Sequence, residues 1–166
     1  MNRLFALLIL TCPLAAFGAS NPDASFFKHA AEGGIAEVDA GNLAQQKAGG
    51  QNVKDFGAMM VKDHSAANGK LQTIAASKNI TLPSSASVGQ MAAKAKLDVL
   101  SGSAFDASYI KGQVRAHEKT LVLFRKEITA GQDAEAKAFA KETLPTVKSH
   151  LKAIKTIAAQ AGVAVQ

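Results

Sequence analysis

The sequence has few of the residues that most often carry covalent or cofactor chemistry. It contains one cysteine, Cys12, no tryptophan and a single tyrosine, Tyr109. Because Cys12 lies in a segment that we expect to be removed, the mature chain would have no disulfide, no thiolate metal ligand and no covalent haem attachment. Any metal ion would therefore be held by nitrogen and oxygen atoms.

The sequence also lacks the patterns of strands, membrane spans and nucleic-acid contacts. No short runs of alternating apolar and polar residues indicate strands, and no mature segment is apolar all round, so we predict no transmembrane segment. Nucleic acid is not an expected partner, because basic and aromatic residues are not interleaved. No nucleophile-base set, phosphate loop or dinucleotide fingerprint supports an enzyme activity.

Residues 1–20 have the organisation of a secretory signal peptide. Arg3 precedes an apolar run, Leu4 to Leu10, and the small-residue stretch AAFGAS follows it. The run is too short to span a bilayer, so we expect cleavage and export to the periplasm. Removal of Arg3 lowers the net charge from +6 to +5, and residues 21–166 are long enough for a single domain with one core.

Glycine, serine and proline punctuate the remaining chain at a few points and leave long helical stretches between them. Asn21 and Pro22 are typical of a helix start, and breaks follow at 49–50, 80–88, 101–103 and 131–133. Long helices are expected at about 21–47, 51–78, 103–130 and 134–160, with a shorter one at about 89–100. The pattern predicts an all-α, ferritin-like four-helix bundle with a short extra helix in the crossover between the second and third long helices.

Two histidines occupy positions that an inward apolar stripe would otherwise fill. In the second long helix, His64 lies between Met60 and Ala67 at the three-then-four spacing of a buried helix face. In the third, His117 lies at the same kind of position between Val114 and Leu121. A titratable ring therefore interrupts the predicted core on both helices.

The two other long helices each place one polar group at a comparable height. Glu37 is the only charged member of an inward row in the first helix, and His150 lies beside the apolar centre of the fourth. At 1.5 Å per residue, Glu37, His64, His117 and His150 all lie within about one turn of the middle of their helices. One carboxylate and three imidazoles are a suitable ligand set for zinc, copper or iron.

Two other interpretations remain open. The cluster could be a purely structural polar core in a non-enzymatic envelope or stress-associated interaction protein. Alternatively, Gly34 and Gly41 could open a slot for non-covalent haem between helices. A ferritin-type di-iron site is disfavoured, because Val61, Val114 and Val147 stand where that site has glutamate, three residues before each histidine.

Residues near these positions have simpler expected roles. Asp63 and Glu118 point about 100° away from the adjacent histidines, so we expect them in solvent or in an outer contact at most. Methionines 59 and 60 are expected to fill the core. Tyr109 is expected to be buried with its hydroxyl hydrogen-bonded, and His29 to lie at the surface.

A basic stripe on the fourth long helix suggests one further partner, an anionic envelope surface. It consists of Lys137, Lys141, Lys148, Lys152 and Lys155.

Four blocks together resemble a known bacterial family: AAEGGIAEVDAGNLAQQKA, VKDFGAMMVKDH, SGSAFDASYIKGQVRAHEKTLVLF and FAKETLPTVKSHL. They are similar to domain of unknown function 4142, whose members are sometimes labelled outer membrane proteins. The resemblance implies an exported, ferritin-like four-helix bundle and supplies no established activity. The family pattern covers Glu37, Asp63, His64, Asp106, Tyr109, His117, Leu144, Pro145 and His150.

Overall fold

The computed structural model describes residues 23–165, so the expected signal peptide and the expected helix start at Asn21 and Pro22 lie outside the described residues. Helices account for most of the described part of the chain, which confirms the all-α prediction. The long helices begin and end within a few residues of the expected positions. The five helices are α1 (Ala24–Lys47), α2 (Gln51–Ser77), α3 (Val88–Asp98), α4 (Gly102–Ala130) and α5 (Ala134–Gln160).

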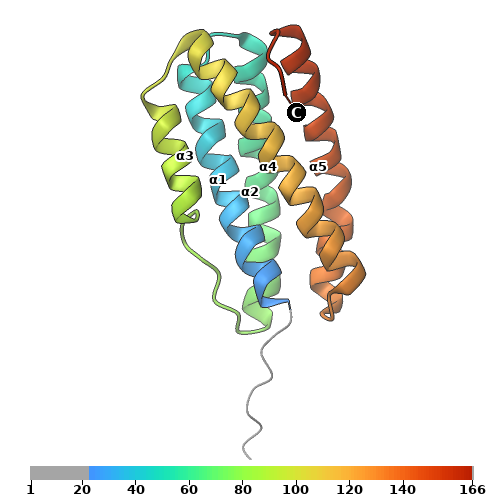
Figure 1. Ribbon diagram of the computed structural model, residues 1–166. Coiled ribbons are helices and arrows are strands. Elements are labelled where there is room, and N and C mark those ends of the chain that lie inside the picture. The colour runs from blue at the N-terminus through green and yellow to red at the C-terminus, as the bar shows by residue number, and fades with distance from the viewer. Residues whose placement is uncertain (1–22, 166) are drawn as a thin grey trace, which may run out of the picture.

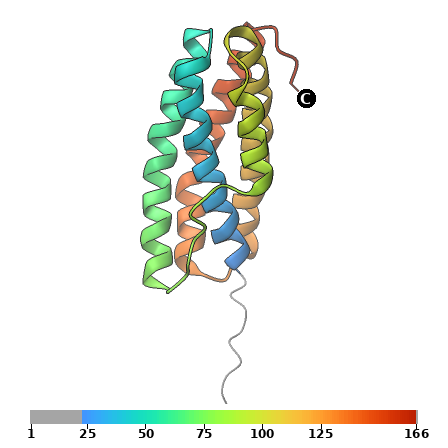
Figure 2. The same cartoon turned by 90° about the vertical axis from the view of Figure 1, so that its left-hand side faces the viewer.

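The four long helices form two antiparallel hairpins, α1 with α2 and α4 with α5 (Figure 1). Between the hairpins, residues 78–87 and α3 run back along the length of the bundle, and this segment crosses α1 in the second view (Figure 2). Helices α2 and α4 therefore run in the same direction, and Ala48 at the end of α1 pairs with Gly102 at the start of α4. This is the predicted ferritin-like arrangement with a short helix in the crossover.

Side chains from distant parts of the chain fix the helix connections. The carboxylate of Asp106 accepts hydrogen bonds from the backbone N–H groups of Gly49 and Gly50, at 3.0 and 2.8 Å, and so joins α4 to the α1–α2 turn. Ser87 and Gln90 form a reciprocal capping box at the start of α3. These contacts satisfy N–H groups that helix ends and turns leave without helical partners.

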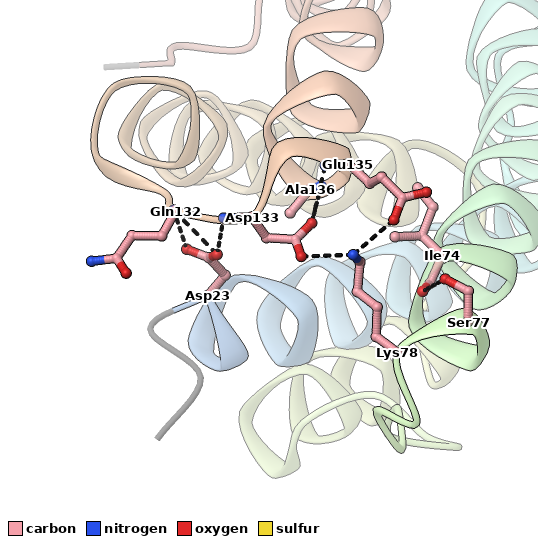
Figure 3. Close-up of polar contacts among 8 residues, drawn as sticks. All are labelled: Asp23, Ile74, Ser77, Lys78, Gln132, Asp133, Glu135 and Ala136. Carbon is pink, nitrogen blue, oxygen red and sulfur yellow. Dashed lines mark hydrogen bonds and ion pairs between the residues drawn. The ribbon is translucent and has the colours of Figure 1, made fainter. Parts of the chain in front are cut away.

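At the opposite end of the bundle, acidic side chains bind the α4–α5 turn (Figure 3). Asp23 accepts hydrogen bonds from the backbone N–H groups of Gln132 and Asp133. The carboxylate of Asp133 caps α5 and also pairs with Lys78 at 2.7 Å, and Lys78 contacts Glu135 at the same distance. The starts of α1 and α5 and the end of α2 are thereby held together.

The buried apolar side chains form two clusters separated along the bundle. One contains Phe56, Met60 and Val114, together with Ile154 of α5. The other lies further along α2 and α4, where it contains Leu71 and Phe124, and it reaches α5 at residues 136–140. His64, His117 and His150 all fall between the two clusters in sequence. The bundle therefore has a polar layer between two apolar ones.

The glycines of α1 are accounted for by contacts with α2. A β-carbon at Gly41 would lie 2.6 Å from the carbonyl oxygen of Gly57, and one at Gly34 would lie 1.8 Å from the side-chain oxygen of Asn68. These two positions are filled by the α2 backbone and by a polar side chain. They leave no slot for a haem, so the haem interpretation loses the feature on which it depended.

None of the helices described in residues 23–165 is both long and apolar enough to cross a membrane.

Candidate metal centre

Three histidines from three helices converge in the polar layer. His64 of α2, His117 of α4 and His150 of α5 each offer one ring nitrogen, and these three atoms lie within 4.8 Å of one another. The ring centroids are 5.9 Å apart for His64 and His117, and 5.5 Å apart for the other two pairs. Apolar spacing placed His64 and His117 inward on their helices, and the packing of helices of similar length brings all three rings to one height.

The three rings lie in the interior of the bundle, beside an aromatic side chain. His117 and His150 are 1% and 2% exposed, and His64 is partly buried. The ring of Phe56, two turns before His64 on α2, packs edge-on against His117 and His150. The distances between ring centroids are 6.2 and 6.4 Å. Electrostatic interactions within such a site are stronger than in water, and an unpartnered polar atom is correspondingly costly.

His117 has one ring nitrogen engaged and one free. Its Nδ1 lies 2.9 Å from the backbone carbonyl oxygen of Gln113, one turn earlier on α4. Because a carbonyl oxygen can only accept, Nδ1 carries the proton in the neutral ring. The lone pair is then on Nε2, which is buried and has no hydrogen-bond partner within residues 23–165.

His150 also has one ring nitrogen in a hydrogen bond and one free, but the roles of Nδ1 and Nε2 are exchanged. Its Nε2 lies 2.9 Å from Oδ2 of Asp63 on α2, while Nδ1 is buried and has no partner in the described part of the chain. Asp63 is therefore more than a solvated neighbour of His64. A carboxylate that accepts a hydrogen bond from the far nitrogen of a histidine fixes the ring and makes the other nitrogen a better ligand.

His64 supplies a third such nitrogen, Nε2, which is also buried and makes no hydrogen bond to any residue that the structure describes. Burial, together with the nearby His117 and His150, lowers the pKa of His64 to about 3. Burial also lowers the pKa of His150, although Asp63 opposes this effect. The neutral ring that metal coordination requires is thus the favoured form of both residues.

Glu37 lies beside this group without joining it. Its Oε1 is 3.9 Å from Nδ1 of His117, which is the engaged side of that ring, and its Oε2 is buried without a partner. Burial raises the pKa of Glu37, while His117 and the side chain of Gln113 lower it. Three of the four polar residues selected from the sequence therefore form one group, and the carboxylate borders it.

The donor set fits a transition-metal ion. Three neutral imidazoles suit zinc and copper, and nitrogens that share one tetrahedral ion at about 2.0–2.1 Å lie roughly 3.4 Å apart. One ring nitrogen from each histidine lies within 4.8 Å of the others, which is near that spacing. Three unpartnered lone pairs in one buried layer are the feature that a bound cation would satisfy.

The remaining sequence predictions near the site had mixed outcomes. His29 is exposed and bonds to Glu32 at 3.2 Å, as expected of a surface residue. Met60 is fully buried in an apolar cluster, as expected of core filling. Tyr109 is fully buried, but the prediction of a bonded hydroxyl is wrong, because that atom has no partner among the described residues. Glu118 forms a surface pair with Lys155 at 2.7 Å.

Fold and site together define an all-α, four-helix-bundle protein with a histidine-lined centre and a helical crossover. Within that class, the chain belongs to the family described as domain of unknown function 4142, whose pattern matches residues 12–157. The match confirms the resemblance found in the sequence. No curated protein shows significant sequence similarity to the chain.

Two solved structures share the fold. One is described as a secreted protein of domain of unknown function 305 from Streptomyces coelicolor, with a TM-score of 0.72 and 12% identity over 89% of this chain and 99% of that one. The other is CopM in the Cu(I)-bound form, with a TM-score of 0.69 and 16% identity over 83% of this chain and 96% of CopM. At these identities the likeness concerns the fold alone.

Proposed function

We propose that this protein is an exported metal-binding protein that holds a single copper ion through His64, His117 and His150. Two observations carry the proposal: one ring nitrogen from each of the three histidines lies within 4.8 Å of the others, and each ring has a buried nitrogen with no hydrogen-bond partner among the described residues. Copper is the first ion to test because imidazole suits it and because CopM, which shares the fold, has been solved in a Cu(I)-bound form.

The arrangement of hydrogen bonds favours a ligand set over a purely structural layer. A structural histidine usually satisfies its polar atoms with protein partners. Here the partnered nitrogens of His117 and His150 point to Gln113 and Asp63, and the free ones are left in the interior. Leaving a buried polar atom unpaired costs about 1–3 kcal/mol, which a bound ion would offset.

The proposal keeps three of the four residues selected from the sequence as ligands. Glu37 faces the protonated side of His117, so we assign it a supporting role. The absence of a carboxylate from the ligand group makes iron the least suited of the three metals, since non-haem iron sites combine histidine with carboxylate. Zinc, which accepts three histidines and an open position, is the direct competitor of copper.

Metal content tests the proposal. The mature chain, residues 21–166 without a histidine tag, would be purified and analysed for copper and zinc, then titrated with each ion. At a free-ion concentration 100 times the dissociation constant, binding should stabilise the fold by about 2.7 kcal/mol and raise the melting temperature by roughly 10 °C. Failure of both ions to co-purify and to raise the melting temperature would exclude the proposed function.

The basic stripe supports a second proposal, contact with an anionic envelope surface. Lys141, Lys148 and Lys152 are exposed on α5, and Lys155 is engaged with Glu118. Exposed lysines near anionic lipid contribute about 1 kcal/mol each at low salt. Co-sedimentation with anionic vesicles, and its loss in 0.5 M salt or with neutral vesicles, would test the contact.

A further inference from the structure

A cavity of about 120 Å³ lies between α3 and the pair formed by α1 and α4. Met91 and Lys94 of α3 line its outer side, and Gly112 of α4 lines its wall. Helix α3 buries none of its own residues, and Met91 is 45% exposed. The cavity is therefore covered by a helix that is only lightly attached to the bundle.

Three residues that line this cavity each carry a buried oxygen atom with no hydrogen-bond partner among the described residues: Oε2 of Glu37, the hydroxyl of Tyr109 and the side-chain oxygen of Gln113. The three residues are 6%, 0% and 4% exposed. All three atoms are oxygens that can accept a hydrogen bond or contact a cation. A cavity of this size that is lined by several polar groups suits water or a hydrated ion.

The same wall borders the histidine group. Glu37 also lines a smaller cavity, of about 30 Å³, to which His64 contributes. Its Oε1 is 3.9 Å from Nδ1 of His117, and that nitrogen is bonded to the backbone of Gln113. One carboxylate side chain therefore stands between the larger cavity and the three histidines.

We infer that the cavity under α3 is the access chamber through which a hydrated divalent cation reaches the histidine group. The inference rests on the proposed function. Glu37, Tyr109 and Gln113 supply oxygen atoms that replace part of the hydration shell of the ion. The carboxylate of Glu37, which borders both cavities, lies on the path from these oxygens to the histidine nitrogens.

The smaller cavity is the alternative route. It is lined by apolar residues, such as Leu71 and Phe124, and by polar ones, such as Asn68 and Thr120. Its volume of about 30 Å³ is that of a single water molecule. The larger cavity, of about 120 Å³, has room for an ion with part of its water shell.

The natural fluorophore of the chain makes uptake measurable. Tyr109 is the only tyrosine, there is no tryptophan, and this residue lines the chamber. Cu(II) should quench its emission on binding nearby, so stopped-flow mixing gives the rate of uptake. The amplitude of the same signal gives the binding capacity, that is, the amount of copper bound per protein chain.

Two glycines provide a matched pair of variants. A β-carbon at Gly112 or at Gly69 would meet nothing within 4 Å, and both residues lie inside long helices. Gly112 lines the chamber, whereas Gly69 is exposed on α2. Gly112→Leu should fill the chamber and slow Cu(II) uptake at least tenfold with unchanged capacity. Gly69→Leu should leave the rate unchanged.

The outcomes separate this inference from the proposed function. If the wild-type protein shows no quenching and retains no copper, both the access chamber and the proposed copper site are excluded. Full capacity with a wild-type rate in Gly112→Leu would overturn the access chamber and leave the copper site standing. If Gly112→Leu does not fold, Ala93→Leu fills the chamber from α3, where no residue is buried, and an unchanged rate in that variant would overturn the inference equally.

Discussion

Asp63 of α2 and His150 of α5 lie 2.9 Å apart, from Oδ2 to Nε2, although 87 positions separate them in the chain. The carboxylate holds the ring so that Nδ1 is the nitrogen left free in the interior. If the site binds copper, Asp63→Ala should weaken binding 10- to 100-fold, the usual effect of losing an outer carboxylate partner. Competition titration against a copper chelator would measure this loss.

Glu118 offers a matched control for that prediction. It follows His117 in sequence as Asp63 precedes His64, but it pairs with Lys155 at the surface. Glu118→Ala should leave the copper affinity within about a factor of two of the wild-type value. Equal losses in the two variants would show that the contact between Asp63 and His150 has no particular role.

Replacing His64 by leucine should separate stability from binding. The substitution removes a buried nitrogen that has no partner and puts an apolar side chain of similar size in its place. We expect the metal-free protein to gain about 1 kcal/mol in free energy of unfolding and to lose its copper-dependent stabilisation. Chemical denaturation with and without copper would show both effects. A destabilised metal-free variant that still binds copper would contradict the account, and His29→Leu at the surface is the control.

The depressed pKa of His64 predicts a pH dependence with a definite sign. Its pKa is about 3 in the folded chain and 6.5 as an ordinary histidine, so between these values the unfolded state binds more protons. The stability contributed by the neutral ring is present above pH 6.5 and decreases as the pH falls towards 3. The slope is at most about 1.4 kcal/mol per pH unit for one residue.

Glu127 changes the stability of the fold with pH in the opposite direction to His64. The pH dependence of wild type must therefore be compared with that of the His64→Leu variant. Burial, Asp23 and Asp133 raise the pKa of Glu127 to about 7, which makes the fold more stable as the pH falls from 7 to 4.5. Both proteins contain Glu127, so it cancels in the difference between wild type and His64→Leu. Denaturation at several pH values should show this difference widening in favour of the leucine variant below pH 6.5. A constant difference would contradict the assignment.

Gly41→Ala tests the close contact between α1 and α2. The new β-carbon would lie 2.6 Å from the carbonyl oxygen of Gly57, which is backbone and cannot rotate away. We expect a loss of about 1–3 kcal/mol from overpacking, despite a gain in helix propensity of about 1 kcal/mol. Gly69→Ala, where the β-carbon meets nothing within 4 Å, should show the gain alone. Thermal denaturation of the two variants would compare their stabilities. Equal stabilisation would show that a β-carbon at position 41 does not clash with the Gly57 carbonyl.

Much of the fold could be predicted from local sequence signals. Glycines at 49–50 and 131 and the Ser101–Gly102 pair mark turns, and the helices end within a few residues of them. The inward positions of His64 and His117 followed from apolar spacing, since a helix repeats its buried face every three or four residues. The prediction that His150 lies at the same height along the bundle as these two histidines rested on the helix lengths alone.

The contacts between helices could not be predicted in the same way. Asp63 points away from the inward face of its own helix, and only packing against α5 brings it to His150. Asp106 of α4 accepts a hydrogen bond from the backbone of Gly50, 56 residues earlier in the chain. The packing of α3 against α1 and α4 forms the cavity beside Tyr109, whose hydroxyl has no partner among the described residues. Such relationships arise from long-range packing, which spacing within one helix does not encode.

The most direct measurement is a copper titration of the wild-type mature chain and of four single variants, each with one histidine replaced by alanine. The account predicts one equivalent of tightly bound copper for the wild type and for His29→Ala. It predicts loss of that binding in His64→Ala, His117→Ala and His150→Ala, each of which should remain helical by circular dichroism. Tight binding that survives in all three of these variants, or that disappears with His29, would contradict a copper site built from the three buried imidazoles.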